Sequence, residues 1–297
     1  MLQLNGVEHV YPNGTRALDG VTMSIGKGMF GLLGPNGAGK SSLMRTIATL
    51  QTPTAGTIHF GDIDVLAEPT RLRSTLGYLP QDFGVYPRVS AYDLLDHMVS
   101  LKGITASGER KATVETLLNQ VNLWNVRNKA VAGFSGGMRQ RFGIAQALIG
   151  NPELIIVDEP TAGLDPEERN RFYNLLVEIG ENVVIILSTH IVEDVADLCP
   201  RMAVLAAGRI ELEGAPSELI QRSRGTIWAK TIERDQLDDV RSNHEVISTR
   251  LLAGRTIVHV LSELDPGNGF ALVEGGLEDV YMSTLAHTRR PAAAKAA

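Results

Sequence analysis

The stretch GPNGAGKSS, residues 34–42, follows a short apolar segment, GMFGLL, and opens a helical one, KSSLMRTIATL. The spacing G-x-x-x-x-G-K-S lets a backbone fold tightly around an anion, and a helix start supplies unpaired N–H groups. The order strand, glycine-rich loop, helix therefore predicts a phosphate loop beside a buried strand. The alternative, a glycine-rich surface turn, leaves the lysine and the hydroxyls unexplained.

Each polar residue of this phosphate loop suits one part of a nucleotide. Lys40 would reach the β- and γ-phosphates, Ser41 would bind Mg²⁺, and Ser42 is placed to reach the α-phosphate. The remaining candidates for contact with the phosphates lie on the loop backbone: Gly34, Asn36, Gly37, Ala38 and Gly39.

A second apolar segment, LIIVDEP, ends in two carboxylates. Acidic groups at the tip of a buried strand cost free energy unless they meet cations or water. Asp158 is placed to hold Mg²⁺ through water, and Glu159 to orient or deprotonate an attacking water. The alternative is a pair of solvated charges, which the phosphate loop upstream makes the weaker interpretation.

Three further residues are weak signals individually. The segment ILSTH ends an apolar strand at His190, whose imidazole could contact a γ-phosphate if that strand lies beside the one carrying Glu159. The segment YLPQD puts Gln81, a modest ligand for Mg²⁺ or water, at another strand end. In VYPNG, Tyr11 lies in a turn where its ring could stack on adenine. Capping histidines and Tyr-Pro turns are common, so none of these residues decides a function.

A second anion-type turn lies in AGFSGGMRQR, residues 132–141. Ser135, Gly136 and Gly137 precede a helical pattern, as in a helix start that holds an anion. One chain thus carries two such turns, and its own residues do not explain the second.

Secondary-structure patterns predict an α/β fold. The first part of the chain reads as strands joined by short turns, and residues 87–150 read as mainly helical. Beyond them, apolar strands alternate with helices, which indicates a parallel sheet covered on both faces. Residues 223–286 read as a small α+β accessory domain, and we expect 287–297 to be a disordered tail.

Composition excludes several classes. The net charge of −6 argues against a nonspecific nucleic-acid binder. The one cysteine, Cys199, rules out a disulfide framework within the chain and favours a reducing compartment. No run of apolar residues is long enough to span a bilayer, so we expect the chain not to cross a membrane by itself.

Taken in order, these motifs resemble the nucleotide-binding domain of ATP-binding cassette (ABC) transporters, over roughly residues 1–222. The resemblance implies a RecA-like P-loop core, an antiparallel β-subdomain and a helical subdomain over about 87–150. It implies ATP and Mg²⁺ as ligands and ATP hydrolysis as the activity. The motifs that carry it are Tyr11, GPNGAGKSS, Gln81, FSGGMRQR, LIIVDEP, AGLD (162–165) and His190.

The resemblance also assigns roles and explains the second turn. Ser135, Gly136 and Gly137 would close on the ATP of a second copy or a homologous ATPase subunit, so that two chains pair head-to-tail. The family turn usually reads Leu-Ser-Gly-Gly-Gln, whereas this chain has Phe134 and Met138 at its ends. The other implied roles are adenine stacking for Tyr11, Mg²⁺ sensing for Gln81, the Walker B position for Asp158, the catalytic base for Glu159, the switch for His190 and a dimer contact for Asp165.

A transporter subunit without a spanning segment needs separate permease subunits, at the cytoplasmic side of the cell membrane. The segment DFGVYPRVSAYDLL after Gln81 resembles the groove that grips a permease, although ordinary helical core is an open alternative. The ending GGLEDVYMSTL resembles the tail of exporter ATPases with six-helix permeases. An importer subunit, a non-transport ABC ATPase and an ATP-switch scaffold are the alternatives.

Overall fold

A six-stranded sheet forms the centre of the protein. The computed structural model describes residues 1–81, 84, 86–160 and 165–289. Neighbouring strands of this sheet run parallel, except β9 and β10, which are antiparallel. In spatial order the strands are β10 (Arg209–Gly214), β9 (Arg201–Ala206), β3 (Gly28–Leu33), β8 (Val184–Thr189), β7 (Leu154–Asp158) and β6 (Leu76–Leu79).

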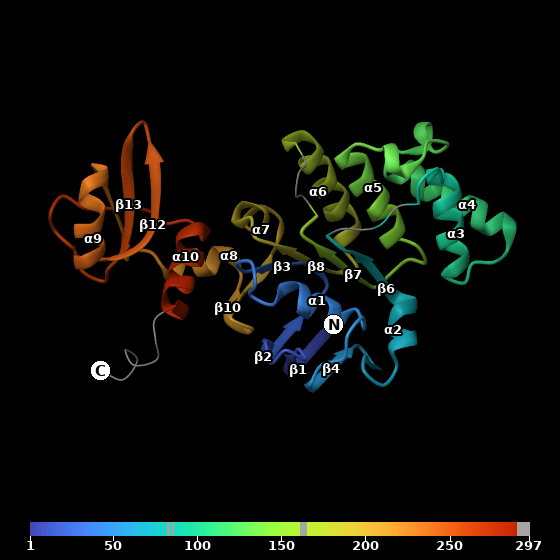
Figure 1. Ribbon diagram of the computed structural model, residues 1–297, viewed down its shortest axis with the longest axis horizontal. Coiled ribbons are helices and arrows are strands. Elements are labelled where there is room, and N and C mark those ends of the chain that lie inside the picture. The colour runs from blue at the N-terminus through green and yellow to red at the C-terminus, as the bar shows by residue number, and fades with distance from the viewer. Residues whose placement is uncertain (82–83, 85, 161–164, 290–297) are drawn as a thin grey trace.

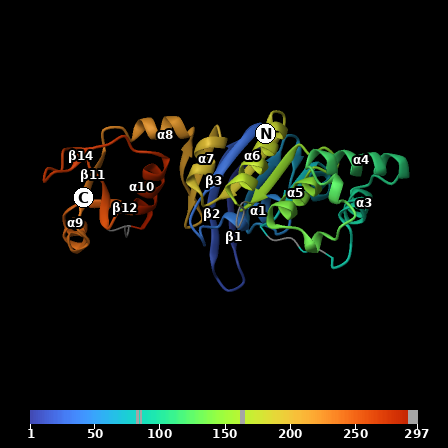
Figure 2. The same cartoon turned by 90° about the horizontal axis from the view of Figure 1, so that it is seen from above.

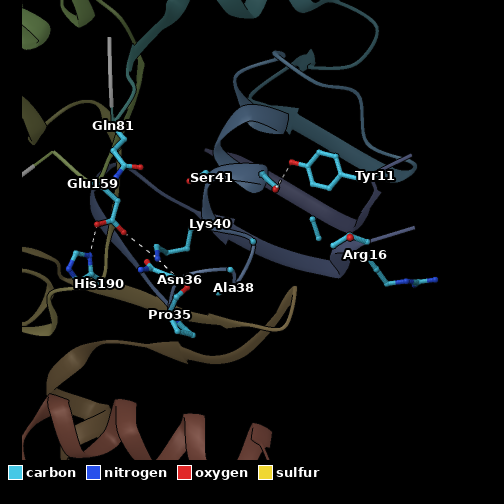
Figure 3. A pocket seen from close by; sticks show the side chains of 15 residues that line it. Tyr11, Arg16, Pro35, Asn36, Ala38, Lys40, Ser41, Gln81, Glu159 and His190 are labelled. Atoms are coloured by element: carbon cyan, nitrogen blue, oxygen red, sulfur yellow. Dashed lines mark hydrogen bonds and ion pairs between the residues drawn. The ribbon is translucent and has the colours of Figure 1, made fainter. Parts of the chain in front are cut away.

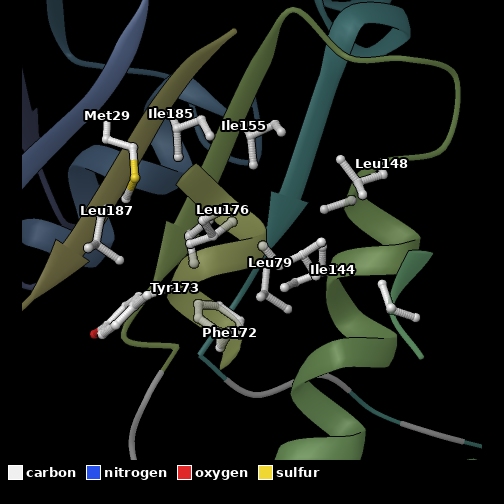
Figure 4. Close-up of a cluster of buried hydrophobic side chains, with 14 of the residues drawn as sticks. Met29, Leu79, Ile144, Leu148, Ile155, Phe172, Tyr173, Leu176, Ile185 and Leu187 are labelled. Atoms are coloured by element: carbon white, nitrogen blue, oxygen red, sulfur yellow. The ribbon is translucent and has the colours of Figure 1, made fainter. Parts of the chain in front are cut away.

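Both faces of the central sheet are buried, which confirms the sequence prediction. Successive residues of β7 alternate between two cores: Ile155 packs with helices on one face and Ile156 with those on the other. Figure 4 shows the first core, where Leu79, Ile155 and Ile185 meet side chains of the covering helices. That face carries α5 (Gly136–Ala147), α6 (Pro166–Gly180) and α7 (Val192–Leu198), and the other carries α1 (Lys40–Ile47).

A smaller antiparallel sheet packs over α1 and belongs to the second core. It brings the N-terminal hairpin to the start of α1, as Figure 1 shows in blue. Its strands, in spatial order, are β2 (Arg16–Ile25), β1 (Leu2–Val10), β4 (Ala55–Phe60) and β5 (Ile63–Asp64).

Helices occupy the segment between β6 and β7, as predicted. They lie at one end of the elongated molecule, seen at the right of Figures 1 and 2. Not all of the first part consists of strands and turns, as we expected: a helix, α2 (Pro69–Thr75), precedes β6, so the apolar segment STLGYLPQ is a strand only from Leu76. The other elements are α3 (Ala91–Leu101), α4 (Ser107–Gln120) and the 3₁₀ turns Trp124–Val126 and Val131–Gly133.

The C-terminal part forms a third sheet at the opposite end. Its own small core consists of Ile232, Val240, Val258, Val260 and Phe270. The final helix, α10 (Leu277–Arg289), extends into the segment that we expected to be a tail; residues 290–297 lie outside the described ones. The remaining elements are α8 (Pro216–Arg222), β11 (Ile227–Ile232), the 3₁₀ turn Arg234–Gln236, α9 (Leu237–Asn243), β12 (Glu245–Leu252), β13 (Arg255–Leu261) and β14 (Ala271–Leu272).

The last helix returns to the central core. Leu277, Val280, Tyr281 and Leu285 are buried and belong to the same cluster as α5, α6 and α7. The boundary near residue 222 between a nucleotide-binding and an accessory domain stays a proposal. None of the described helices is long and apolar enough to cross a bilayer.

Candidate nucleotide-binding and hydrolysis site

A cavity of about 410 Å³ lies beside the phosphate loop, where the carboxyl ends of β3, β6, β7 and β8 meet (Figure 3). Ligands of parallel α/β sheets bind at this edge because strand-end loops converge there. The fold thus brings five separate predictions into one place: the phosphate loop, Tyr11, Gln81, Glu159 and His190. The lining residues are Tyr11, Thr15, Arg16, Ala17, Pro35, Asn36, Gly37, Ala38, Gly39, Lys40, Ser41, Ser42, Gln81, Glu159 and His190.

The phosphate loop is held in shape by its glycines and by Lys40. Gly39 caps α1 with φ at +109°, and a Cβ there would lie 2.4 Å from the Ala17 carbonyl oxygen, so only glycine fits. The Lys40 side chain is 6% exposed, and its ammonium donates to the Gly34 carbonyl oxygen at 2.6 Å. Its Nζ also lies 3.3 Å from Glu159 Oε1. The Lys40 ammonium therefore lies at the edge of the cavity, between the phosphate loop and Glu159.

Glu159 lies between two partners in Figure 3. Its Oε1 faces Lys40, and its Oε2 lies 2.5 Å from His190 Nδ1. The backbone of Glu159 has φ at +49°, a left-handed conformation rare for a non-glycine residue, and its N–H donates to the Ser188 carbonyl oxygen at 2.8 Å. Strained conformations of this kind gather at functional sites. The β7 end thus aims this carboxylate at the loop.

Asp158, the neighbouring carboxylate, is buried and 3% exposed. Its Oδ1 has no hydrogen-bond partner among the described residues. Burial raises the pKa of Asp158, while the hydroxyls of Ser188 and Ser41 act in the opposite direction. A buried carboxylate oxygen without a partner, beside a serine hydroxyl, matches the oxygen ligands that Mg²⁺ prefers. These residues therefore fit the ion that the sequence led us to expect.

Replacing Asp158 with asparagine is expected to stabilise the nucleotide-free chain at neutral pH. A folded pKa above the ordinary value of 3.8 means that the folded chain loses stability as pH rises through that pKa. The gain from asparagine is therefore complete above the folded pKa and vanishes below 3.8. We expect a rise in Tm of about 2–4 °C, or about 1 kcal/mol, in thermal melts.

Mg-ATP should reverse this ranking, because the substituted amide no longer offers the ion an anionic ligand. The stabilisation that Mg-ATP gives to the parent chain should shrink in the variant. A lower Tm without nucleotide at neutral pH would contradict the burial argument.

The N-terminal hairpin supplies one wall of the cavity. Tyr11 Oη lies 2.9 Å from Ser42 Oγ, and the Tyr11 ring meets His9 edge-on. Arg16 pairs with Asp19 at 2.8 Å and lies across the hairpin from Val10. Sequence reasoning missed Thr15, Arg16, Ala17 and Pro35 as lining residues. Thr15, Arg16 and Ala17 follow Tyr11 closely in the chain, and Pro35 lies inside the phosphate loop, so their sequence positions were the available signal.

The signature turn, residues 135–137, does not contribute to this cavity. Ser135 caps α5, and its Oγ accepts from the Met138 N–H at 3.3 Å. Phe134 is buried and meets Phe142 edge-on, so it fills an apolar socket. Met138 is half-buried and packs against the same core. Phe134 and Met138, the two departures from the family pattern, therefore pack into the core beside the start of α5.

Two expected contact regions are only partly described. Asp165 caps α6, with its Oδ1 accepting from the Glu168 N–H at 2.8 Å, and its side chain is exposed. Residues 162–164 of AGLD lie outside the described residues, as do Phe83 and Val85 of the predicted permease groove. Tyr86 of that segment is exposed.

Comparison with known proteins decides the family. The family model described as ABC transporter matches residues 18–162. The daunorubicin/doxorubicin resistance ATP-binding protein DrrA of Streptomyces peucetius is 35% identical over 269 residues, covering 89% of this chain and 78% of DrrA. The chain belongs to the ATP-binding subunits of ABC transporters.

Other ABC relatives extend the comparison. The methionine import ATP-binding protein MetN 2 of Bacillus anthracis is 35% identical over 80% of this chain and 74% of its own length. A dimeric ATP-binding cassette solved in a post-hydrolysis state with ADP and Pi superposes with a TM-score of 0.65 at 28% identity. That match covers 72% of this chain and 98% of the solved one.

Membership settles the fold and the general chemistry. The central sheet with its phosphate loop is the RecA-like P-loop core of ABC cassettes. The ABC subunit is an ATPase that uses ATP with Mg²⁺. Its relatives include importer-type and exporter-type subunits, so membership does not fix the direction of transport.

Proposed function

We propose that this chain powers an ABC exporter as a head-to-tail dimer bound to separate transmembrane subunits, peripheral to the cytoplasmic side of the cell membrane. The convergence of Lys40, Glu159 and His190 at one sheet edge carries the hydrolytic part of the proposal. The sequence of the C-terminal end and the match to a drug-resistance subunit support the exporter part.

Hydrolysis is assigned to the groups around Glu159. Its carboxylate accepts a proton from the attacking water, and the His190 Nδ1 contact fixes its direction. When ATP binds, the Lys40 ammonium leaves the Gly34 carbonyl oxygen and Glu159 and contacts the β- and γ-phosphates instead. This exchange frees Glu159 for the water, so nucleotide binding itself prepares the base.

The other assignments rest on the resemblance to ABC cassettes, and Tyr11, Ser41, Ser42 and Gln81 line the cavity. Bound Mg²⁺ supplies charge neutralisation between the phosphates, and Asp158, Ser41 and Gln81 would hold it, Asp158 through water. Tyr11 stacks on adenine, and Ser42 contacts the α-phosphate. The phosphate loop contributes backbone N–H groups from Gly34, Asn36, Gly37, Ala38 and Gly39.

The signature turn is assigned to the partner's nucleotide. Ser135, Gly136 and Gly137 are absent from the cavity of their own chain, and the first two are exposed. An exposed helix start attracts anions from outside its own chain. The dimeric cassette with ADP and Pi among the solved relatives supports pairing of this kind. Asp165 would contact the partner beside this turn.

The C-terminal end favours export. The segment GGLEDVYMSTL forms the start of α10, whose Leu277 and Tyr281 are buried in the central core. The resemblance of this segment to exporter ATPase tails, together with the match to a drug-resistance subunit over 89% of the chain, supports an exporter. The importer is the second candidate, because a methionine import subunit matches over 80% of the chain.

Co-purification under mild detergent tests the assignment. The tagged chain should retain a polytopic membrane protein, and the complex should hydrolyse Mg-ATP. A complex that also requires a separate substrate-binding protein for stimulation would favour the importer. Retention of ribosomes or DNA in place of a membrane protein would contradict both candidates.

A further inference from the structure

The signature turn already holds an anionic side chain within its own chain. Glu168, from the first turn of α6, is half-buried, and the Ser135 hydroxyl donates to its Oε1 at 3.4 Å. A Cβ built on Gly137 would lie 2.1 Å from Glu168 Cδ and within 2.3 Å of both carboxylate oxygens. The absence of a side chain at Gly137 therefore gives this carboxylate its place on the α5 start.

The start of α6 is fixed in a way that directs Glu168 there. Asp165 accepts from the Glu168 N–H at 2.8 Å, and proline occupies the first helical position. On the next residue, Arg169 Nη2 lies 3.1 Å from Oδ1 of Asp194, whose side chain is 1% exposed. The N-cap and the ion pair fix the first turn of α6, so the position of Glu168 follows from the fold.

Electrostatics makes this contact attractive. The N-terminus of α5 carries unpaired N–H groups and the positive end of a helix dipole, which favour a nearby negative charge. Arg139, one turn into the same helix, adds positive charge to this end. A carboxylate and a phosphate both bind to unpaired N–H groups and positive charge, and they cannot occupy the turn at the same time.

We propose that Glu168 is an internal competitor for the signature turn. In the separated chain its carboxylate occupies the turn, and it moves aside when a second copy delivers the γ-phosphate of bound ATP. This inference rests on the proposed head-to-tail dimer. Glu168 thereby sets the ATP concentration at which two chains associate.

ATP-driven dimerisation of a hydrolysis-deficient chain tests the competition. In a Glu159→Gln background, Glu168→Gln removes the charge but keeps the shape. Glu167→Gln is the matched control, since Glu167 is exposed on the same helix turn and pairs with Arg171. The measurement is the dimer dissociation constant at fixed Mg-ATP, by analytical ultracentrifugation. Nucleotide affinity at low protein concentration and far-UV circular dichroism report folding.

We expect Glu168→Gln to tighten the dimer and Glu167→Gln to leave it unchanged. Losing a helix-terminal competitor is worth about two- to five-fold per turn, and the dimer closes two turns, which gives about 4- to 25-fold. An unchanged or weaker dimer, or an equal shift with Glu167→Gln, would overturn the role of Glu168 alone. Absence of ATP-driven dimers in every variant would overturn the trans site itself.

Discussion

The Glu159→Gln variant should hydrolyse ATP at least about 100-fold more slowly than the parent complex while binding ATP normally. Glutamine keeps the shape that fits between Lys40 Nζ and His190 Nδ1 but cannot accept the proton of the attacking water. The measurement is phosphate release by the assembled transporter with saturating Mg-ATP. ATP affinity of the isolated chain serves as the binding readout.

A matched control substitution shows whether the loss of one negative charge is by itself enough to slow hydrolysis. Glu181→Gln removes the same charge from an exposed position at the C-terminal end of α6 that does not line the cavity. Its rate should equal that of the parent. A Glu159→Gln complex as fast as the parent would refute the assignment of the base and leave the nucleotide-binding assignment standing.

Replacing Ser135 with arginine should abolish turnover by the dimer and leave ATP binding by the isolated chain nearly unchanged. Ser135 does not line the cavity of its own chain, and it is exposed at the α5 start. The arginine would place bulk and positive charge where the partner's γ-phosphate is proposed to bind. Phosphate release and fluorescent-nucleotide titration give the two readouts.

Loss of a helix cap is the competing explanation, and Ser90 controls for it. Ser90 caps α3 in the same manner, with its Oγ accepting from the Asp93 N–H at 3.1 Å. Each cap is worth about 1 kcal/mol, so Ser90→Arg should lower the free energy of unfolding similarly. Because Ser90 lies in the segment that resembles the permease groove, turnover is compared in the dimer without permease, where Ser90→Arg should preserve it. Equal loss of binding and turnover in Ser135→Arg would show that the turn serves its own chain.

The site could be predicted from the sequence because each of its parts is a short motif at the end of a strand. The parallel sheet then brings these strand ends together. The glycine-rich loop, Asp158–Glu159 and His190 each follow an apolar strand, and the structure confirms three such strands, β3, β7 and β8, side by side. Parallel pairing brings their carboxyl ends to one edge, so strand-end residues meet. Adjacency of β3 and β8 then puts the loop beside the histidine.

The remaining features depend on packing between distant segments. Glu168 reaches Ser135 across 33 residues, and Arg16 faces the cavity because the hairpin folds over α1. The short helix α2 was missed, since its polar sequence has only Leu72 buried. The hydrophobic periodicity of these segments does not indicate which distant residues of the chain they contact.

The position of α10 changes the description of the C-terminal part. Helix α10 packs against α7, α8 and β9 and also against β12, so it joins the central core to the C-terminal sheet. Along the chain, the sheet of β11 to β14 lies between two helices, α8 and α10, that both contribute buried residues to the central core. Truncation after residue 222 would remove α10 from the ATPase core and expose the apolar surface against which α10 packs.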